Sequence, residues 1–146
     1  YIAQVVNDGL LVYFGYPQAG EDDALQAVHA ALALLHVVKR RQEELLQDTH
    51  GMLALRIGID TGLVIMSQTS GDGRDEVLAM GVPPKLAAQL QILANPYTTV
   101  VSATTARLVA GIARLKDLGE HTIHGVDDPV QLYEVLGTRA MPSRLT

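Results

Sequence analysis

The stretch 5–15, VVNDGLLVYFG, decides how the chain begins to fold. Two apolar runs flank Asn7-Asp8-Gly9, and short β-branched and aromatic runs separated by such a triplet are typical of a β-hairpin. Gly9 supplies the positive φ that this turn needs. Asp8 then lies at the hairpin tip, either as a turn former or as a carboxylate that faces a cation.

Composition limits the class of protein. The 146 residues fit one domain, and a content of 48% hydrophobic and 18% charged residues predicts a packed core rather than disorder. The absence of cysteine excludes disulfides and thiol chemistry and suits a cytoplasmic protein. A net charge of −5 argues against nucleic acid or an anionic membrane as the main partner. No apolar run is long enough to cross a bilayer.

The order of elements predicts an α+β fold. A helix is expected over 22–47, since Glu21, Asp22 and Asp23 favour a helix start and apolar residues recur after them at helical spacing. Segment 68–75 is polar and rich in glycine, so it is expected to be an exposed loop or hairpin tip. Further strands are expected over 1–6, 9–14, 53–59, 63–67, 98–101, 115–122 and 130–135, with helices over 84–94 and 103–110.

These elements form an antiparallel sheet with helices packed on it. In the helix over 84–94, Leu86, Leu90 and Leu93 are expected to point inward, and Ser102 caps the helix over 103–110. A strand–helix unit before Tyr1 would complete a ferredoxin-like core, so the chain is expected to be a domain over 1–136 that lacks this unit. Residues 137–146 are expected to be a linker.

Several motifs, in order along nearly the whole chain, resemble those of one family. NDGLLVYFGYP at 7–17 resembles the central hairpin of class III adenylate and guanylate cyclases. LRIGIDTG at 55–62 resembles the segment that follows, and GVPPKLAAQLQ at 81–91 resembles the helix Gly-x-x-x-Asn-x-Ala-Ala-Arg-Leu-Gln of the family. Gly119, Gly125 and the segment 129–135 resemble the last strands. The chain is identified as a class III cyclase homology domain of bacterial type.

The resemblance implies a known chemistry. Such domains convert ATP or GTP into a cyclic nucleotide and pyrophosphate, with two carboxylates that hold Mg²⁺ or Mn²⁺. The sites lie between two protomers of a homodimer or a heterodimer with another cyclase-type domain. One protomer supplies the carboxylates, and the other supplies an Asn and an Arg that orient the ribose and stabilise the transition state.

When the resemblance is applied residue by residue, some functional positions of the family match this chain and others do not. Asp8 matches the second metal carboxylate, whereas the first belongs to a strand before Tyr1. Lys85 stands where the family has its ribose-orienting Asn, and Gln89 stands where it has the catalytic Arg. Neutral Gln89 cannot replace a guanidinium beside a developing charge. Alternatively, Lys85 and Gln89 are ordinary solvent-facing helix residues.

Nucleotide recognition departs from the family in the same way. Gln4 falls where many members have a purine-reading Lys, and Leu78 falls near its acidic partner. His124 falls where a Lys that binds the triphosphate is common. These positions therefore do not distinguish ATP from GTP.

Three functions follow from the resemblance. The first is a degenerate domain that acts as a dimerising or nucleotide-sensing regulatory module. The second is a working cyclase whose intact or heterodimeric parent supplies the missing groups. The third is a structural scaffold that binds no nucleotide.

Overall fold

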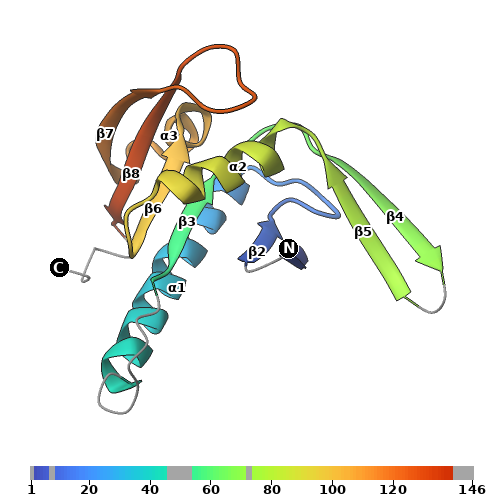
Figure 1. The fold of residues 1–146 in the computed structure, drawn as a ribbon, viewed down its shortest axis with the longest axis horizontal. Coiled ribbons are helices and arrows are strands. Elements are labelled where there is room, and N and C mark those ends of the chain that lie inside the picture. The colour runs from blue at the N-terminus through green and yellow to red at the C-terminus, as the bar shows by residue number, and fades with distance from the viewer. Residues whose placement is uncertain (1, 7–8, 46–53, 72–73, 140–146) are drawn as a thin grey trace.

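The computed structural model describes residues 2–6, 9–45, 54–71 and 74–139, which form an α+β fold (Figure 1). The class predicted from the sequence is confirmed. The elements in chain order are β1 (Ile2–Val6), β2 (Gly9–Tyr13), α1 (Asp23–Leu45), β3 (Arg56–Ile59), β4 (Ile65–Gly71), β5 (Arg74–Met80), α2 (Val82–Leu93), β6 (Thr98–Ser102), α3 (Ala103–Val109), β7 (Ala113–His121) and β8 (Val130–Thr138).

The central sheet has the strand order β3-β6-β8-β7. Strand β8 pairs antiparallel with β7, as an antiparallel sheet predicts, and also pairs antiparallel with β6. Strand β3 differs, because it pairs parallel with β6. Parallel neighbours need a long crossover, and the β4–β5 hairpin and α2 supply it. The carboxyl ends of β3 and β6 consequently meet at the same edge of the sheet.

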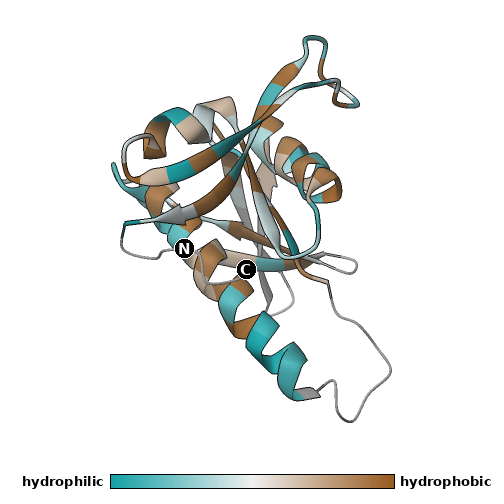
Figure 2. Ribbon diagram, turned by 90° about the vertical axis from the view of Figure 1, so that its left-hand side faces the viewer, coloured by the Kyte–Doolittle hydropathy of each residue, from teal (hydrophilic) through white to brown (hydrophobic). Residues whose placement is uncertain are grey.

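Helices cover both faces of this sheet. On one face, Val101 of β6 belongs to the same buried cluster as Val28 of α1 and Val109 of α3. On the other face, Val100 belongs to a cluster with Leu90 of α2. Successive strand residues point to opposite faces, so β6 serves both clusters. Helix α1 continues past the sheet, and its last turns are hydrophilic (Figure 2).

Helix α2 crosses β3 at very close range. A Cβ atom at Gly58 would clash with the carbonyl oxygen of Ala87 and the amide nitrogen of Gln91. Only glycine allows a helix backbone to lie this near a strand. Gly58 therefore fixes how α2 sits on the sheet, and α2 carries both Lys85 and Gln89.

Two hairpins stand apart from the central sheet. Strands β1 and β2 pair antiparallel from Ile2 opposite Tyr13 to Val6 opposite Gly9, which confirms the predicted hairpin. Gly9 is the first residue of β2, and the turn residues 7–8 lie outside the described part of the chain. Strands β4 and β5 form the second hairpin, which extends away from the body of the molecule (Figure 1).

The second hairpin corrects the sequence analysis. Segment 68–75 was expected to be an exposed loop or hairpin tip; it spans the end of a hairpin, but β4 runs to Gly71 and β5 begins at Arg74, so most of the segment is strand. Ladder hydrogen bonds join backbone groups, so polar composition does not prevent a strand. The described part of the chain therefore has one strand more than the sequence predicted.

Smaller differences lie at the ends of elements. Leu86 and Leu90 are buried as predicted, but Leu93 at the end of α2 is 46% exposed, and Ala94 occupies the buried position after it. Strand β3 begins at Arg56, and β8 continues to Thr138, within the segment expected to be a linker. In the part of the chain that the structure describes, no helix is long and apolar enough to span a membrane.

Candidate functional site

The two predicted catalytic positions lie on helix α2. Lys85 is exposed and Gln89 is half-buried, and a separation of four residues places them on one side of the helix. Within the described ranges, neither side chain makes a hydrogen bond or an ion pair. The structure brings these two residues together.

The other predicted residues are spread over the fold. Gln4 is exposed on β1, opposite Leu11. Leu78 is a backbone partner of Ser67 in the β4–β5 ladder, and His124 is exposed in the connection between β7 and β8. Asp8 lies outside the described residues.

A metal site needs several oxygen or nitrogen ligands close together. Over residues 2–6, 9–45, 54–71 and 74–139, no group of three or more His, Asp or Glu side chains lies close enough to hold a metal ion. These residues alone do not fit the Mg²⁺ or Mn²⁺ that the resemblance implies. We therefore derive no catalytic step through a metal from them.

The structure brings a different set of polar groups together, at the carboxyl ends of β3 and β6. Asp60 directly follows β3, and Ser102 ends β6 and caps α3. The Ser102 hydroxyl donates a hydrogen bond of 2.6 Å to Oδ1 of Asp60. Parallel pairing of Ile59 with Val101 explains why these residues, 42 positions apart in sequence, are neighbours.

Further hydrogen bonds hold this corner rigidly. Oγ of Ser102 accepts a hydrogen bond from the backbone N–H of Thr105, at 3.4 Å. The hydroxyl of Thr105 lies 2.8 Å from that of Thr61. Ser102 and Thr105 are 2% and 0% exposed. The orientation of the Ser102 hydroxyl is therefore fixed by the N–H of Thr105, from which it accepts, and by the carboxylate of Asp60, to which it donates.

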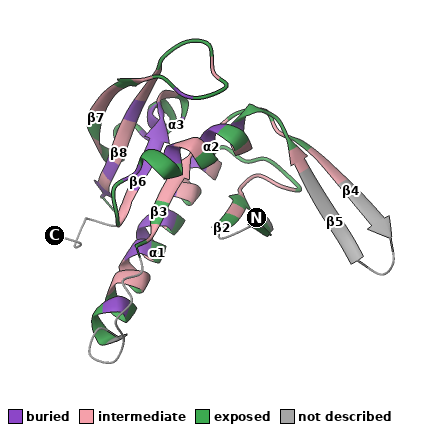
Figure 3. Ribbon diagram, viewed as in Figure 1, coloured by how far each residue is buried: buried purple, intermediate pink, exposed green. Residues whose placement is uncertain are grey.

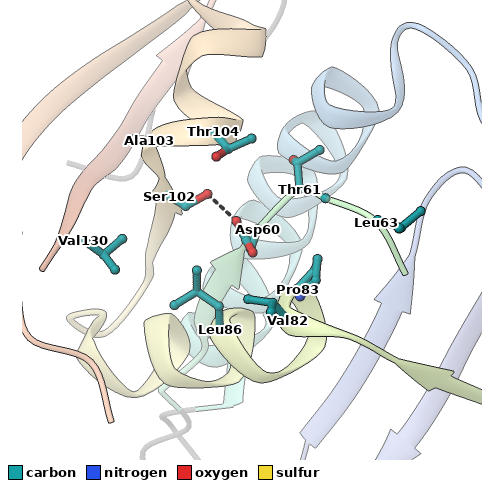
Figure 4. Close-up of a pocket in the computed structure, with 11 residues that line it drawn as sticks. Asp60, Thr61, Leu63, Val82, Pro83, Leu86, Ser102, Ala103, Thr104 and Val130 are labelled. Carbon is teal, nitrogen blue, oxygen red and sulfur yellow. Dashed lines mark hydrogen bonds between the residues drawn. The ribbon is translucent and has the colours of Figure 1, made fainter. Parts of the chain in front are cut away.

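A pocket of about 390 Å³ opens beside this corner (Figure 4). Polar residues from the ends of β3 and β6 and from α3 form one side of it, and apolar residues from α2, β8 and the segment after β3 form the other. The polar side chains are Asp60, Thr61, Ser102 and Thr104, and the apolar ones are Leu63, Val82, Pro83, Leu86 and Val130. In Figure 4, Asp60 lies between Ser102 and the α2 residues.

The electrostatics of the pocket centre on Asp60. Burial raises the pKa of this carboxyl from its ordinary value of 3.8, and hydrogen bonds from Ser102 and from the backbone of Thr61 only partly oppose the rise. No Lys, Arg or His in the described ranges forms an ion pair with it. The pocket therefore holds a half-buried carboxylate without a compensating charge.

Sequence reasoning missed this corner. It placed Asp60 just after a strand that ends at residue 59, within the motif at 55–62, and placed Ser102 only as a helix cap. A signal was present, because both strands end in a hydroxyl or carboxyl residue. Its meaning depends on parallel pairing of β3 with β6, and the sequence analysis expected an antiparallel sheet.

Comparison with known proteins agrees with this fold. Residues 3–137 match the family "Adenylate and Guanylate cyclase catalytic domain". The adenylyl cyclase CyaB from P. aeruginosa is 28% identical, with a TM-score of 0.84 over 94% of this chain and 71% of that one. The guanylyl cyclase Cya2 has the same TM-score of 0.84 at 24% identity, over 92% of this chain and 68% of that one, and so supports the fold.

A curated relative is much longer than this chain. An uncharacterised protein from Rhizobium meliloti (strain 1021) is 27% identical over 131 residues, which are 90% of this chain and 12% of that protein.

The family match and the similar solved structures show that the fold is that of a class III nucleotidyl cyclase domain. The chain belongs to the adenylate and guanylate cyclase catalytic domain family.

Proposed function

We propose that this domain is a degenerate class III nucleotidyl cyclase domain that serves as a dimerising or nucleotide-sensing regulatory module. One observation carries the proposal. Lys85 and Gln89 share one side of α2 and stand at the two positions where the resemblance expects Asn and Arg. On this basis the domain alone does not form cyclic nucleotide.

Charge explains why Gln89 matters most. Phosphoryl transfer develops negative charge on the transferred group, and an arginine there accelerates related reactions by roughly 10³–10⁵. A neutral amide supplies no such stabilisation. Lys85 offers a point charge, which can attract a phosphate but cannot copy the paired donor and acceptor of an asparagine amide. Binding is therefore better preserved than catalysis.

Nucleotide binding rests on the remaining positions. We propose that Asp8 contributes one oxygen ligand to Mg²⁺ or Mn²⁺, which would neutralise charge on the triphosphate of ATP or GTP. Gln4 and Leu78 would lie near the base, and His124 would lie near the triphosphate. The guanylate cyclase domain of RhGC from Catenaria anguillulae has been solved with GTP, which supports nucleotide binding as a property of this fold.

Dimerisation has support in exposed apolar pairs on both hairpins. Val5 and Leu10 face each other across the β1–β2 ladder and are 79% and 55% exposed. Ile65 and Met80 do so across the β4–β5 ladder and are 59% and 51% exposed. Apolar surface of this kind favours association. The guanylyl cyclase domain of RhoGC from Blastocladiella emersonii is described as a dimer.

The test is an assay of cyclic nucleotide formation from ATP and from GTP with Mn²⁺, combined with direct measurement of nucleotide binding. The wild-type protein, expressed with the residues that precede Tyr1 so that the first metal carboxylate is included, is compared with the double variant Lys85→Asn/Gln89→Arg and with Asp8→Ala. We expect binding without turnover in the wild type, turnover in the double variant, and weaker binding in Asp8→Ala.

Other outcomes separate the competing functions. Turnover by the wild type that is lost in Asp8→Ala would overturn the degenerate-domain proposal. Turnover only after addition of a cyclase domain that retains Asn and Arg would favour an active heterodimer. Absence of nucleotide binding in every variant, with a stable dimer, would favour a structural scaffold.

A further inference from the structure

The pocket beside Asp60 is separate in chemistry from the predicted nucleotide positions. None of its lining residues is a position that the cyclase resemblance assigns to metal, base, ribose or phosphate. Its volume of about 390 Å³ lies within the range of small-molecule sites, about 300–1,000 Å³. Ligand binding in this pocket therefore does not depend on whether the domain binds or converts a nucleotide.

The charge in the pocket decides the kind of ligand. Asp60 is half-buried, and its Oδ1 already accepts the hydrogen bond from Ser102. No cationic side chain of the described residues pairs with it. An anionic ligand would be repelled, and a single carboxylate is too few ligands for a metal ion. A positively charged hydrogen-bond donor would supply the missing charge.

The apolar wall of the pocket determines which chemical character the rest of the ligand must have. Val82, Pro83 and Leu86 present apolar groups from the start of α2, and Val130 adds another from β8. Pro83 has no backbone N–H, so this part of the wall offers no donor to Asp60. A carboxylate on one side and an apolar wall on the other match a molecule that has a charged end and an apolar body.

We propose that this pocket binds a small organic amine, whose ammonium group pairs with Asp60 and whose compact apolar body packs against Val82, Pro83 and Leu86. Ser102 holds the carboxylate in place for this contact. The ligand would bridge the β6–α3 corner and the first turns of α2. It would thus contact the helix that carries Lys85 and Gln89 without touching either residue through the pocket lining.

The test uses n-butylammonium as the probe, n-butanol as its neutral counterpart, and amide NMR of the whole protein. We expect saturable shifts at Asp60, Val82 and Ser102 with the ammonium ion and much weaker shifts with the alcohol. Asp60→Asn keeps the shape and an acceptor for Ser102 but removes the charge, and we expect it to weaken ammonium binding by about tenfold or more.

Two further variants keep the result interpretable. Asp127→Asn changes an exposed carboxylate outside the pocket, and binding should be unchanged. Val82→Trp fills the rim from a side chain that is 63% exposed, so it should abolish binding even if Asp60→Asn fails to fold. Equal shifts with alcohol and ammonium, or unchanged affinity in both pocket variants, would overturn the proposal.

Discussion

The central sheet buries its apolar side chains, whereas the two hairpins leave apolar side chains exposed. Val101 and Leu90 in the sheet clusters are 0% exposed, whereas Val5 on β1 is 79% exposed and Ile65 on β4 is 59% exposed. Figure 3 shows buried residues along β6 and exposed residues on β2. The sheet is covered by helices on both faces. In the described part of the chain, each hairpin makes its extensive contacts only between its own two strands. Stability therefore resides in the sheet, and the hairpins leave apolar side chains exposed.

The test with the largest expected effect replaces one leucine in each region by alanine. Leu90→Ala empties a site that is 0% exposed between α2 and the sheet, and we expect a loss of about 3 kcal/mol in the free energy of unfolding. Leu10→Ala removes the same atoms from a residue that is 55% exposed in the single chain, and at protein concentrations at which the monomer predominates we expect a change within about 0.5 kcal/mol. Denaturant unfolding measures both.

Similar losses for the two variants would contradict the comparison. They would mean that β1–β2 is buried within the monomer, whereas burial in the proposed dimer would appear only at higher protein concentration. Repeating Leu10→Ala at several protein concentrations separates these cases, because a dimer contact depends on concentration.

The second test concerns the closeness of α2 to β3. Gly58→Ala places a methyl group against the backbone of α2 at Ala87 and Gln91, and we expect about 2 kcal/mol of destabilisation because the helix must shift. Gly20→Ala is the matched control, since its Cβ would lie 3.5 Å from Oδ1 of Asp23, an ordinary contact. Thermal or denaturant unfolding of the two variants should differ clearly. A well-tolerated Gly58→Ala would show that α2 is not fixed on the sheet.

The third test concerns Ser102, at the end of β6 in the central sheet. Ser102→Ala removes both the cap of α3 and the donor to Asp60, and we expect a loss of about 1–2 kcal/mol. Thr104→Ala, two residues away and exposed, should change the unfolding free energy by less than about 0.5 kcal/mol. Equal effects of the two variants would mean that the Ser102 hydroxyl has no special role.

The sequence predicted what depends on local patterns. The β1–β2 hairpin follows from apolar runs around residues 7–9, and α2 follows from Leu86 and Leu90 at helical spacing together with Pro83 and Pro84 at its start. Strand β5 was missed because backbone pairing, rather than an apolar pattern, defines it. The burial of Leu93 was overpredicted because helical spacing does not show where the sheet beneath a helix ends.

The site was harder to predict than the fold. The positions of Lys85 and Gln89 follow from one helical motif, so sequence alone could place them on the same side of α2. The contact between Asp60 and Ser102 depends on parallel pairing of β3 and β6 across an intervening hairpin and helix. Such a long-range pairing has no local sequence pattern, and the pocket could be found only in the folded chain.

The smallest effect concerns the ionisation of Asp60. Burial raises the pKa of Asp60 in the folded state above its ordinary value of 3.8, so the folded protein binds this proton more tightly than the unfolded chain does. Ionisation therefore costs stability as the pH rises through 3.8 toward the raised pKa, and the cost is constant above that range. Asn cannot ionise, so Asp60→Asn should gain stability relative to the wild type between pH 3.5 and pH 7.

We expect this pH-dependent gain to be small, because water still screens a half-buried carboxylate. The measurement is the difference in unfolding free energy between Asp60→Asn and the wild type across that pH range, which cancels the titration of all other groups. A wild type that instead gains on the variant as the pH rises would show that the folded state favours the ionised carboxylate. Such a carboxylate would already be compensated within the protein, and an ammonium ligand would then have little to add.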